Sequence, residues 1–150
     1  MNFEARIMDA MKTAMKAKDT VALESLRAIK SALLLAKTDK GGGADFSDEE
    51  GVLLVQKLVK QRKESASIYS GQGRDDLAEA ELAQIAVLEA FLPAQLTPAE
   101  IEVVVNRVIT ELGATGMQDM GKVMGVVTKE LAGSADGGTI SGIVRARLAN

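Results

Sequence analysis

The stretch Leu92-Pro-Ala-Gln-Leu-Thr-Pro-Ala-Glu100 places a helix stop directly before a helix start. Pro93 cannot continue a helix, because it lacks an amide hydrogen and its ring clashes with the preceding turn. Thr97 and Glu100 form the pattern of a capping box, and the proline between them takes the first helical position. The stretch therefore predicts a boundary between two helical domains, residues 1–96 and 97–150.

Four helices are predicted on the N-terminal side of this boundary. In each, apolar residues recur every three or four positions, as on one face of a helix. Ser47 and Glu50 form a second capping-box pattern. The glycine-rich run Lys40 to Asp45 predicts a flexible loop. The expected helices run from Asn2 or Phe3 to Met15, from Asp19 or Thr20 to Ala36, from Ser47 to Tyr69, and from Asp75 or Asp76 to Phe91.

Three shorter helices are predicted on the C-terminal side. The first starts at Thr97 and ends at Gly113, the second spans Gln118 to Leu131, and the third follows Asp136-Gly-Gly138. No segment alternates between apolar and polar residues beside hairpin turns, so no sheet is expected. The predicted fold class is all-α, with a four-helix N-terminal domain followed by a small three-helix tail domain.

The composition restricts the chemistry, because the 150 residues include no cysteine and no histidine. Disulfides, thiolate sites, Cys/His pairs and Ser-His-Asp triads are therefore excluded, and the commonest zinc ligands are missing. A Ser/Lys pair remains, but these residues sit on amphipathic helices without a loop that supplies an oxyanion hole. The acidic runs Asp48-Glu-Glu50 and Asp75-Asp76 are interpreted as first-turn helix caps. We predict no catalytic residue, no metal ligand and no cofactor.

The start of the chain does not look like a signal peptide, because charged and apolar residues are mixed from Met1 to Lys18. No run of about 20 apolar residues is long enough to span a membrane. A cytoplasmic protein without a membrane partner is expected. The net charge of −3 gives no overall attraction to nucleic acid, although residues 1–40 carry eight basic against five acidic side chains.

Two glycines in the run Met120-Gly-Lys-Val-Met-Gly125 are four residues apart and so share one face of a helix. Each costs about 1 kcal/mol relative to alanine in a helix interior, which calls for a compensating contact. One interpretation is a tight helix crossing within the tail. The other is a surface that a nucleic-acid backbone can approach, with Lys122 beside it.

This run, together with Gly133-Ser-Ala-Asp-Gly-Gly138 and the final helix, resembles the tail module of the GatB/YqeY family. That module closes the B subunit of the tRNA-dependent glutamine amidotransferase and occurs in small stand-alone YqeY-like proteins. The resemblance extends through Lys60-Gln-Arg-Lys-Glu-Ser65, Gly73-Arg-Asp-Asp-Leu77 and Leu92-Pro-Ala-Gln-Leu96, but the catalytic body of the larger subunit is missing. The positions that match the family motif are Gly121, Lys122, Met124, Gly125, Asp136 and Gly137 in the tail, with Lys60, Arg62 and Arg74 in the first domain.

The expected third helix carries a run of basic residues. Lys57, Lys60 and Lys63 recur every three residues, with Arg62 next to them. A stripe of this kind attracts phosphates, although it is also typical of an ordinary solvated helix face. No aromatic residue lies within the stripe, which favours recognition of an RNA duplex or backbone over stacking of bases.

Two functions remain open. The resemblance implies a tRNA-binding accessory module related to the glutamine-dependent tRNA amidotransferase, with nucleic-acid contacts at Lys57, Lys60, Arg62, Lys63, Arg74 and Lys122. The alternative is a helical protein-protein adaptor that holds a partner helix in a groove of the tail. The family is filed under carbon-nitrogen ligase activity with glutamine as amido-N-donor, yet no residues for that catalysis are evident in this chain.

Overall fold

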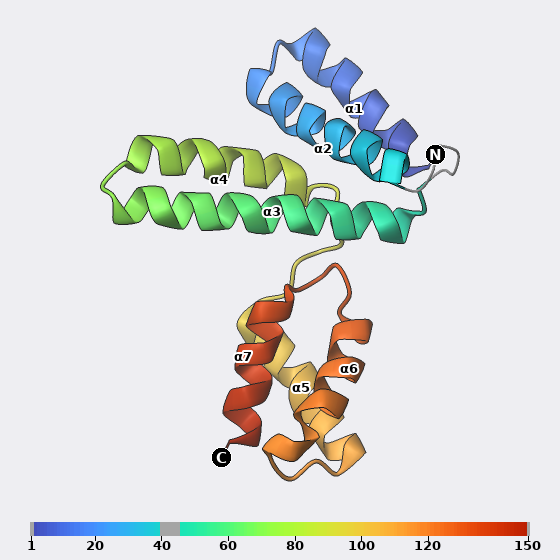
Figure 1. Ribbon diagram of the computed structural model, residues 1–150, viewed down its shortest axis with the longest axis vertical. Coiled ribbons are helices and arrows are strands. Elements are labelled where there is room, and N and C mark those ends of the chain that lie inside the picture. Colours follow the sequence, from blue (N-terminus) through green and yellow to red (C-terminus); the bar gives the residue numbers. More distant parts are fainter. Residues whose placement is uncertain (1, 40–45, 150) are drawn as a thin grey trace. The chain divides into compact units, whose positions relative to one another are not determined.

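The computed structural model describes residues 2–39 and 46–149 of the chain. These residues form seven α-helices and one short 3₁₀ helix, and no β-strand occurs among them (Figure 1). The prediction of an all-α fold is therefore confirmed. The expected glycine loop at 40–45 lies outside the described residues. The elements are α1 (Phe3–Ala17), α2 (Thr20–Asp39), α3 (Asp48–Gly71), α4 (Asp75–Glu89), α5 (Pro98–Leu112), η1 (Met117–Asp119), α6 (Met120–Glu130) and α7 (Gly137–Leu148).

Polar side chains cap the first turns of α1, α3, α5 and α7, where backbone amides have no partner within the helix. At α3, the Ser47 hydroxyl accepts a hydrogen bond from the Glu50 amide at 3.1 Å. At α5 the capping box is complete. The Thr97 hydroxyl accepts from the Glu100 amide at 3.2 Å, and the Glu100 carboxylate accepts from the Thr97 amide at 3.0 Å. Both helix starts lie where the sequence predicts them.

α4 ends at Glu89, earlier than the expected end at Phe91. The amides of the next three residues donate to carbonyls three positions back instead of four, at distances of 3.0 to 3.3 Å. This is the tighter spacing of a 3₁₀ turn, which often closes an α-helix. Pro93 explains the early end, because a proline disfavours α-helical geometry in the residue before it.

The contacts divide the chain into two compact units, Met1–Leu92 and Pro93–Asn150. In the first unit α1 packs beside α2, and α3 packs beside α4 along most of its length (Figure 1). Helix α2 also packs on α4, which joins the two pairs. The core of this unit is mostly aliphatic and consists of Phe3, Ile7, Ala14, Leu26, Ile29, Leu33, Phe46, Val55, Val59, Ile85 and Leu88.

Gly51 of α3 makes room for the side chain of Phe3 on α1. A β-carbon added to Gly51 would lie 2.5 to 2.7 Å from three atoms of the Phe3 ring. Phe3 has no exposed surface, so its ring is enclosed by the core. Only glycine fits at this position without displacing the ring.

The second unit is a bundle of α5, α6 and α7. Its core contains no aromatic residue and consists of Ile101, Val105, Val108, Val123, Val127, Leu131, Ala135, Ile140, Val144 and Leu148. The residues before α5 are hydrogen-bonded to the loop between α6 and α7. The Leu96 amide donates to the Ser134 carbonyl at 2.9 Å, and the Gln95 side-chain amide donates to the Gly133 carbonyl at 2.7 Å. Residues 93–96 therefore belong by their contacts to the second unit.

Candidate nucleic-acid interface

Gly121 and Gly125 lie on the exposed side of α6. A β-carbon built on either glycine meets no atom within 4 Å among the described residues. The reason is helical phase. Val123 and Val127 point into the core, and at about 100° per residue the glycines point away from it. The interpretation of these glycines as a tight helix crossing within the tail is therefore wrong.

Two ion pairs show which sides of α6 and α7 border α5. Glu130 of α6 pairs with Arg107 of α5, and Arg147 of α7 pairs with Glu102 of α5 at 3.7 Å. Each pair marks the side of its helix that borders α5. Because α6 and α7 also pack against each other, the sides turned away from α5 join into one surface.

Helical phase gives the residues on this surface. Gly121, Gly125 and Thr128 lie about 140 to 180° around α6 from Glu130. On α7, Ser141, Gly142 and Arg145 lie about 120 to 160° from Arg147. Lys122 and Lys129 border the glycines of α6. We call this surface the α6–α7 face, and it comprises Gly121, Lys122, Gly125, Thr128, Lys129, Ser141, Gly142 and Arg145.

Charge is unevenly distributed within the second unit. The helices α6 and α7 contain four basic residues and a single acidic one, Glu130, whereas α5 contains three glutamates and one arginine. Hydrogen bonds from Arg107 to Glu130 and Glu111 raise the pKa of the guanidinium above its ordinary value and occupy its donors. Among the described residues, Lys122, Lys129 and Arg145 have no ion-pair partner. The α6–α7 face is therefore basic, although the unit as a whole is not.

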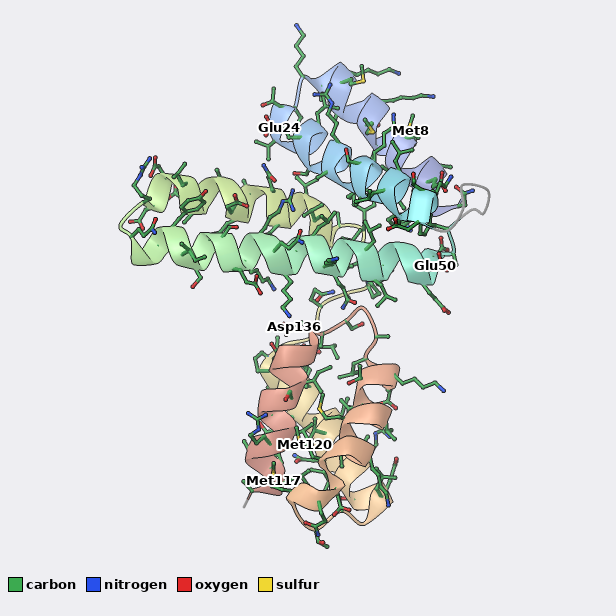
Figure 2. All side chains as sticks on the ribbon, in the orientation of Figure 1. Met8, Glu24, Glu50, Met117, Met120 and Asp136 are labelled. Carbon is green, nitrogen blue, oxygen red and sulfur yellow. The ribbon has the colours of Figure 1, made fainter. Side chains whose placement is uncertain are left out.

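The three remaining motif positions of the tail differ in their surroundings. Met124 is half-buried against the core of the second unit. Asp136 lies at the start of α7 (Figure 2) and caps it by accepting hydrogen bonds from the Thr139 amide and hydroxyl, both at 2.8 Å. A β-carbon on Gly137 meets no atom within 4 Å. Met124 and Asp136 thus support the tail, while Gly137 is open to the surface.

The basic residues predicted in the first unit do not form one surface. Arg62 turns toward α4, where its Nε donates to the Gln84 side chain at 2.8 Å. Lys63 pairs with Glu89 of α4 at 3.8 Å, and Lys60 and Lys57 remain exposed on the outer side of α3. The structure therefore brings together two of these residues.

Arg74 lies beyond the C-terminal end of α3 and is held by a neighbouring carboxylate. Its guanidinium donates two hydrogen bonds to Asp76, at 3.2 and 3.3 Å. The same contact holds the pKa of the Asp76 carboxyl below its ordinary value. Arg74 is thus at the α3–α4 turn, away from Lys57 and Lys60 along the helix.

Lys129, Gly142 and Arg145 of this face were not predicted from the sequence. The available signal was the absence of any acidic residue from 137 to 149, combined with a glycine and an arginine out of phase with the apolar stripe. Lys122 and the two glycines of α6 were found because they belong to a recognisable motif.

Comparison with known proteins identifies the family. A family model described as "Yqey-like protein" matches residues 4–148. The chain belongs to this family. The resemblance to YqeY-like proteins is thereby confirmed over nearly the whole chain.

Curated relatives of this family member occur in fungi. "Altered inheritance of mitochondria protein 41, mitochondrial" of Pyrenophora tritici-repentis is 30% identical over 133 residues, which cover 87% of this chain and 71% of the relative. The protein of the same name from Meyerozyma guilliermondii is 35% identical over 85 residues, or 55% of this chain and 42% of the relative. The match thus spans less than half of the second protein.

The names of these relatives place the fungal proteins in mitochondria. Similarity to these proteins therefore does not indicate that this chain is cytoplasmic. The cytoplasmic location stays a prediction. Across residues 2–39 and 46–149, no helix combines the length and the apolar character that crossing a membrane requires.

Proposed function

We propose that this chain is an RNA-binding accessory protein that contacts the phosphate backbone of tRNA through the α6–α7 face. One observation carries the proposal. Three basic side chains without ion-pair partners among the described residues share one face with two exposed glycines, at which an added β-carbon meets no atom within 4 Å. The choice of tRNA rests on the resemblance to the amidotransferase tail.

The arrangement suits a backbone ligand. The missing side chains at Gly121 and Gly125 let a phosphate come close to the helix, and the neighbouring Lys122 and Lys129 supply the charge that releases counterions. The second unit contains no aromatic residue, so it lacks platforms for stacking bases. With three such cations we expect a dissociation constant of about 10⁻⁴ to 10⁻⁶ M at physiological salt.

Catalysis is not part of the proposal for the chain alone. A glutamine-dependent amide transfer needs an activated nucleophile, and this chain has neither cysteine nor histidine to provide one. We infer that any link to carbon-nitrogen ligase chemistry runs through a partner that supplies the catalytic residues. We also infer that the two compact units are separate domains, and that the protein works in the cytoplasm.

Fluorescence anisotropy with labelled tRNA and the full chain tests the proposal. The triple variant Lys122→Gln, Lys129→Gln, Arg145→Gln should weaken binding and flatten the slope of log affinity against log salt by about 2 to 3. The matched control is Lys57→Gln, Lys60→Gln, Lys63→Gln, which changes the net charge equally but leaves the α6–α7 face intact.

The two variants separate the possible outcomes. Preserved binding in the control and reduced binding in the tail variant supports the α6–α7 face. The opposite result moves the interface to α3. If the unmodified chain binds no tRNA even at low salt, the RNA function is wrong and the adaptor alternative becomes the better one.

A further inference from the structure

A second surface, independent of the α6–α7 face, lies along the hairpin of α1 and α2. The ion pair between Glu4 and Lys37, at 2.8 Å, marks the side of α1 that borders α2. Met8, Met11 and Met15 follow Glu4 on that side of α1 at helical spacing. On α2, Leu23 and Leu34 flank Lys30 on the side that borders α1. We call these five apolar residues the methionine seam.

The seam leaves much apolar surface open. Met8 is 43% exposed, Met15 is 60% exposed and Leu34 is 57% exposed. Met8, Leu34 and Lys30 also line a small cavity of about 80 Å³ between the helices, closed at one end by the Glu4–Lys37 pair. Figure 2 shows the side chain of Met8 on α1. Met11 and Leu23 pack partly against the core that contains Ile7 and Leu33, so the open apolar surface belongs to Met8, Met15 and Leu34.

Basic residues border the seam on both sides. Lys12 lies on the outer side of α1, Arg27 on the outer side of α2, and Lys30 between the apolar residues; all three are exposed. None of them has an ion-pair partner among the described residues. Glu4 is the acidic residue next to the seam, and its carboxylate is already paired with Lys37. Asp9 and Glu24 lie further round their helices, beyond the basic residues.

This pattern of apolar and basic side chains is complementary to one kind of ligand. An apolar row with positive charge on both sides matches an amphipathic helix whose apolar face is flanked by aspartate and glutamate. Methionine side chains are flexible and polarizable, so they adapt to apolar partners of different shape. We infer that the methionine seam is a docking site for an acidic amphipathic helix of a partner protein.

Defined peptides test the inference on the full chain. The probe is an 18-residue fluorescent helix with leucine at i, i+3, i+4 and i+7 and glutamate on both flanks. One comparison peptide has lysine for every glutamate, and another has serine for every leucine. Anisotropy should show binding of the leucine–glutamate peptide and of neither comparison peptide.

Two variants and a control locate the site. Met8→Ser with Met15→Ser should weaken binding about tenfold or more, because the apolar anchors are lost. Lys12→Glu with Lys30→Glu should abolish binding of the acidic peptide and admit the lysine peptide instead, a switch that a folding defect does not produce. The control, Leu82→Ser with Lys60→Glu, changes exposed residues of α4 and α3 and should leave binding unchanged.

Several outcomes would overturn the inference. These are no binding of the acidic peptide, equal binding of the lysine peptide, or an equal loss in the control. Binding of the hairpin to vesicles with anionic phospholipid, or to tRNA, that the acidic peptide does not displace would assign the surface to a lipid or an RNA instead.

Discussion

Glycine occupies two opposite environments within the helices of this chain. At Gly51 the missing side chain makes room for the Phe3 ring, whereas at Gly121 and Gly125 it faces open space. The first glycine stabilises packing. The other two lower helix stability without any contact in return among the described residues.

We expect Gly51→Ala to destabilise the first unit. The added methyl group overlaps the Phe3 ring at 2.5 Å, and overpacking of this kind costs about 1 to 3 kcal/mol. Urea denaturation followed by circular dichroism measures the change. A loss smaller than that of an exposed substitution would mean that the ring moves aside freely.

The substitution Gly125→Ala should have the opposite effect on stability to Gly51→Ala. The alanine fits without contact and favours the helix, so the free energy of unfolding of the second unit should rise by up to about 1 kcal/mol. The same denaturation experiment checks it. A destabilised variant would indicate that the glycine packs closely against something after all.

The sequence was sufficient to predict on which side of its helix each glycine lies. It was not sufficient to predict which atoms the glycine contacts. Val123 and Val127 mark the buried side of α6, and Gly121 and Gly125 are two residues out of step with them. Gly51, by contrast, falls in phase with Val55 and Val59 and so lies on the buried side. What no local pattern shows is that the residue above it is Phe3, because that contact joins distant parts of the chain.

At the scale of single elements, the helix starts were predictable because side chains within three residues decide them. The start of α5 is marked by Thr97, Pro98 and Glu100, which are close together in the sequence. The end of α4 was less predictable, since Pro93 acts over several preceding residues and does not fix the last helical one. The residues of the candidate site were predictable only in part. Lys122 belongs to a motif, but Arg145 joins it through the packing of two helices.

Thr97→Ala should lower the stability of the second unit. The variant loses the hydrogen bond to the Glu100 amide, and a lost cap costs about 1 kcal/mol. Thermal unfolding of the full chain, with the first unit as an internal reference, measures the effect. Thr110→Ala, on the exposed side of the same helix, is the control and should change little.

The Glu100 side chain of the capping box makes a contribution to folding stability that depends on pH. The hydrogen bond from the Thr97 amide lowers the pKa of the Glu100 carboxyl below its ordinary value of 4.5. A lowered pKa in the folded state means stabilisation that is fully present above pH 4.5 and is lost as the pH falls through the folded value. The stability difference between the unmodified chain and Glu100→Gln should therefore shrink in acid. A constant difference between pH 7 and pH 3 would contradict it.

At the scale of the whole molecule, a net charge of −3 conceals strong local differences. The basic excess of residues 1–40 is visible in the sequence, but the basic excess of α6 and α7 is not, because the three glutamates of α5 fall in the same segment. Only the packing of the bundle turns those glutamates away from the α6–α7 face. Surface charge is thus less predictable here than the helices that carry it.

The purified chain should release no ammonia from glutamine and transfer no amide to mischarged tRNA. The reason is the absence of a cysteine or histidine that could activate a nucleophile. A coupled glutamate assay with a known glutaminase as positive control measures it. Activity above buffer that disappears when one serine or lysine is replaced would overturn this prediction.

The second unit should be more stable as an isolated fragment when it includes the residues before α5. Fragment 93–150 keeps the bonds from Gln95 and Leu96 to the α6–α7 loop, whereas fragment 97–150 loses both. We expect cooperative melting for the first and a markedly lower melting temperature for the second. Identical melting curves would show that the two bonds contribute little.

The hydrogen bonds of Gln95 and Leu96 also decide where the second unit can be joined to another protein. Recombination that breaks the coding sequence at Thr97 transplants three helices but leaves the donors for the Gly133 and Ser134 carbonyls behind. A break before Pro93 carries those donors along. The transferable unit is therefore longer than its helices, and a fusion that carries it intact should begin upstream of the proline.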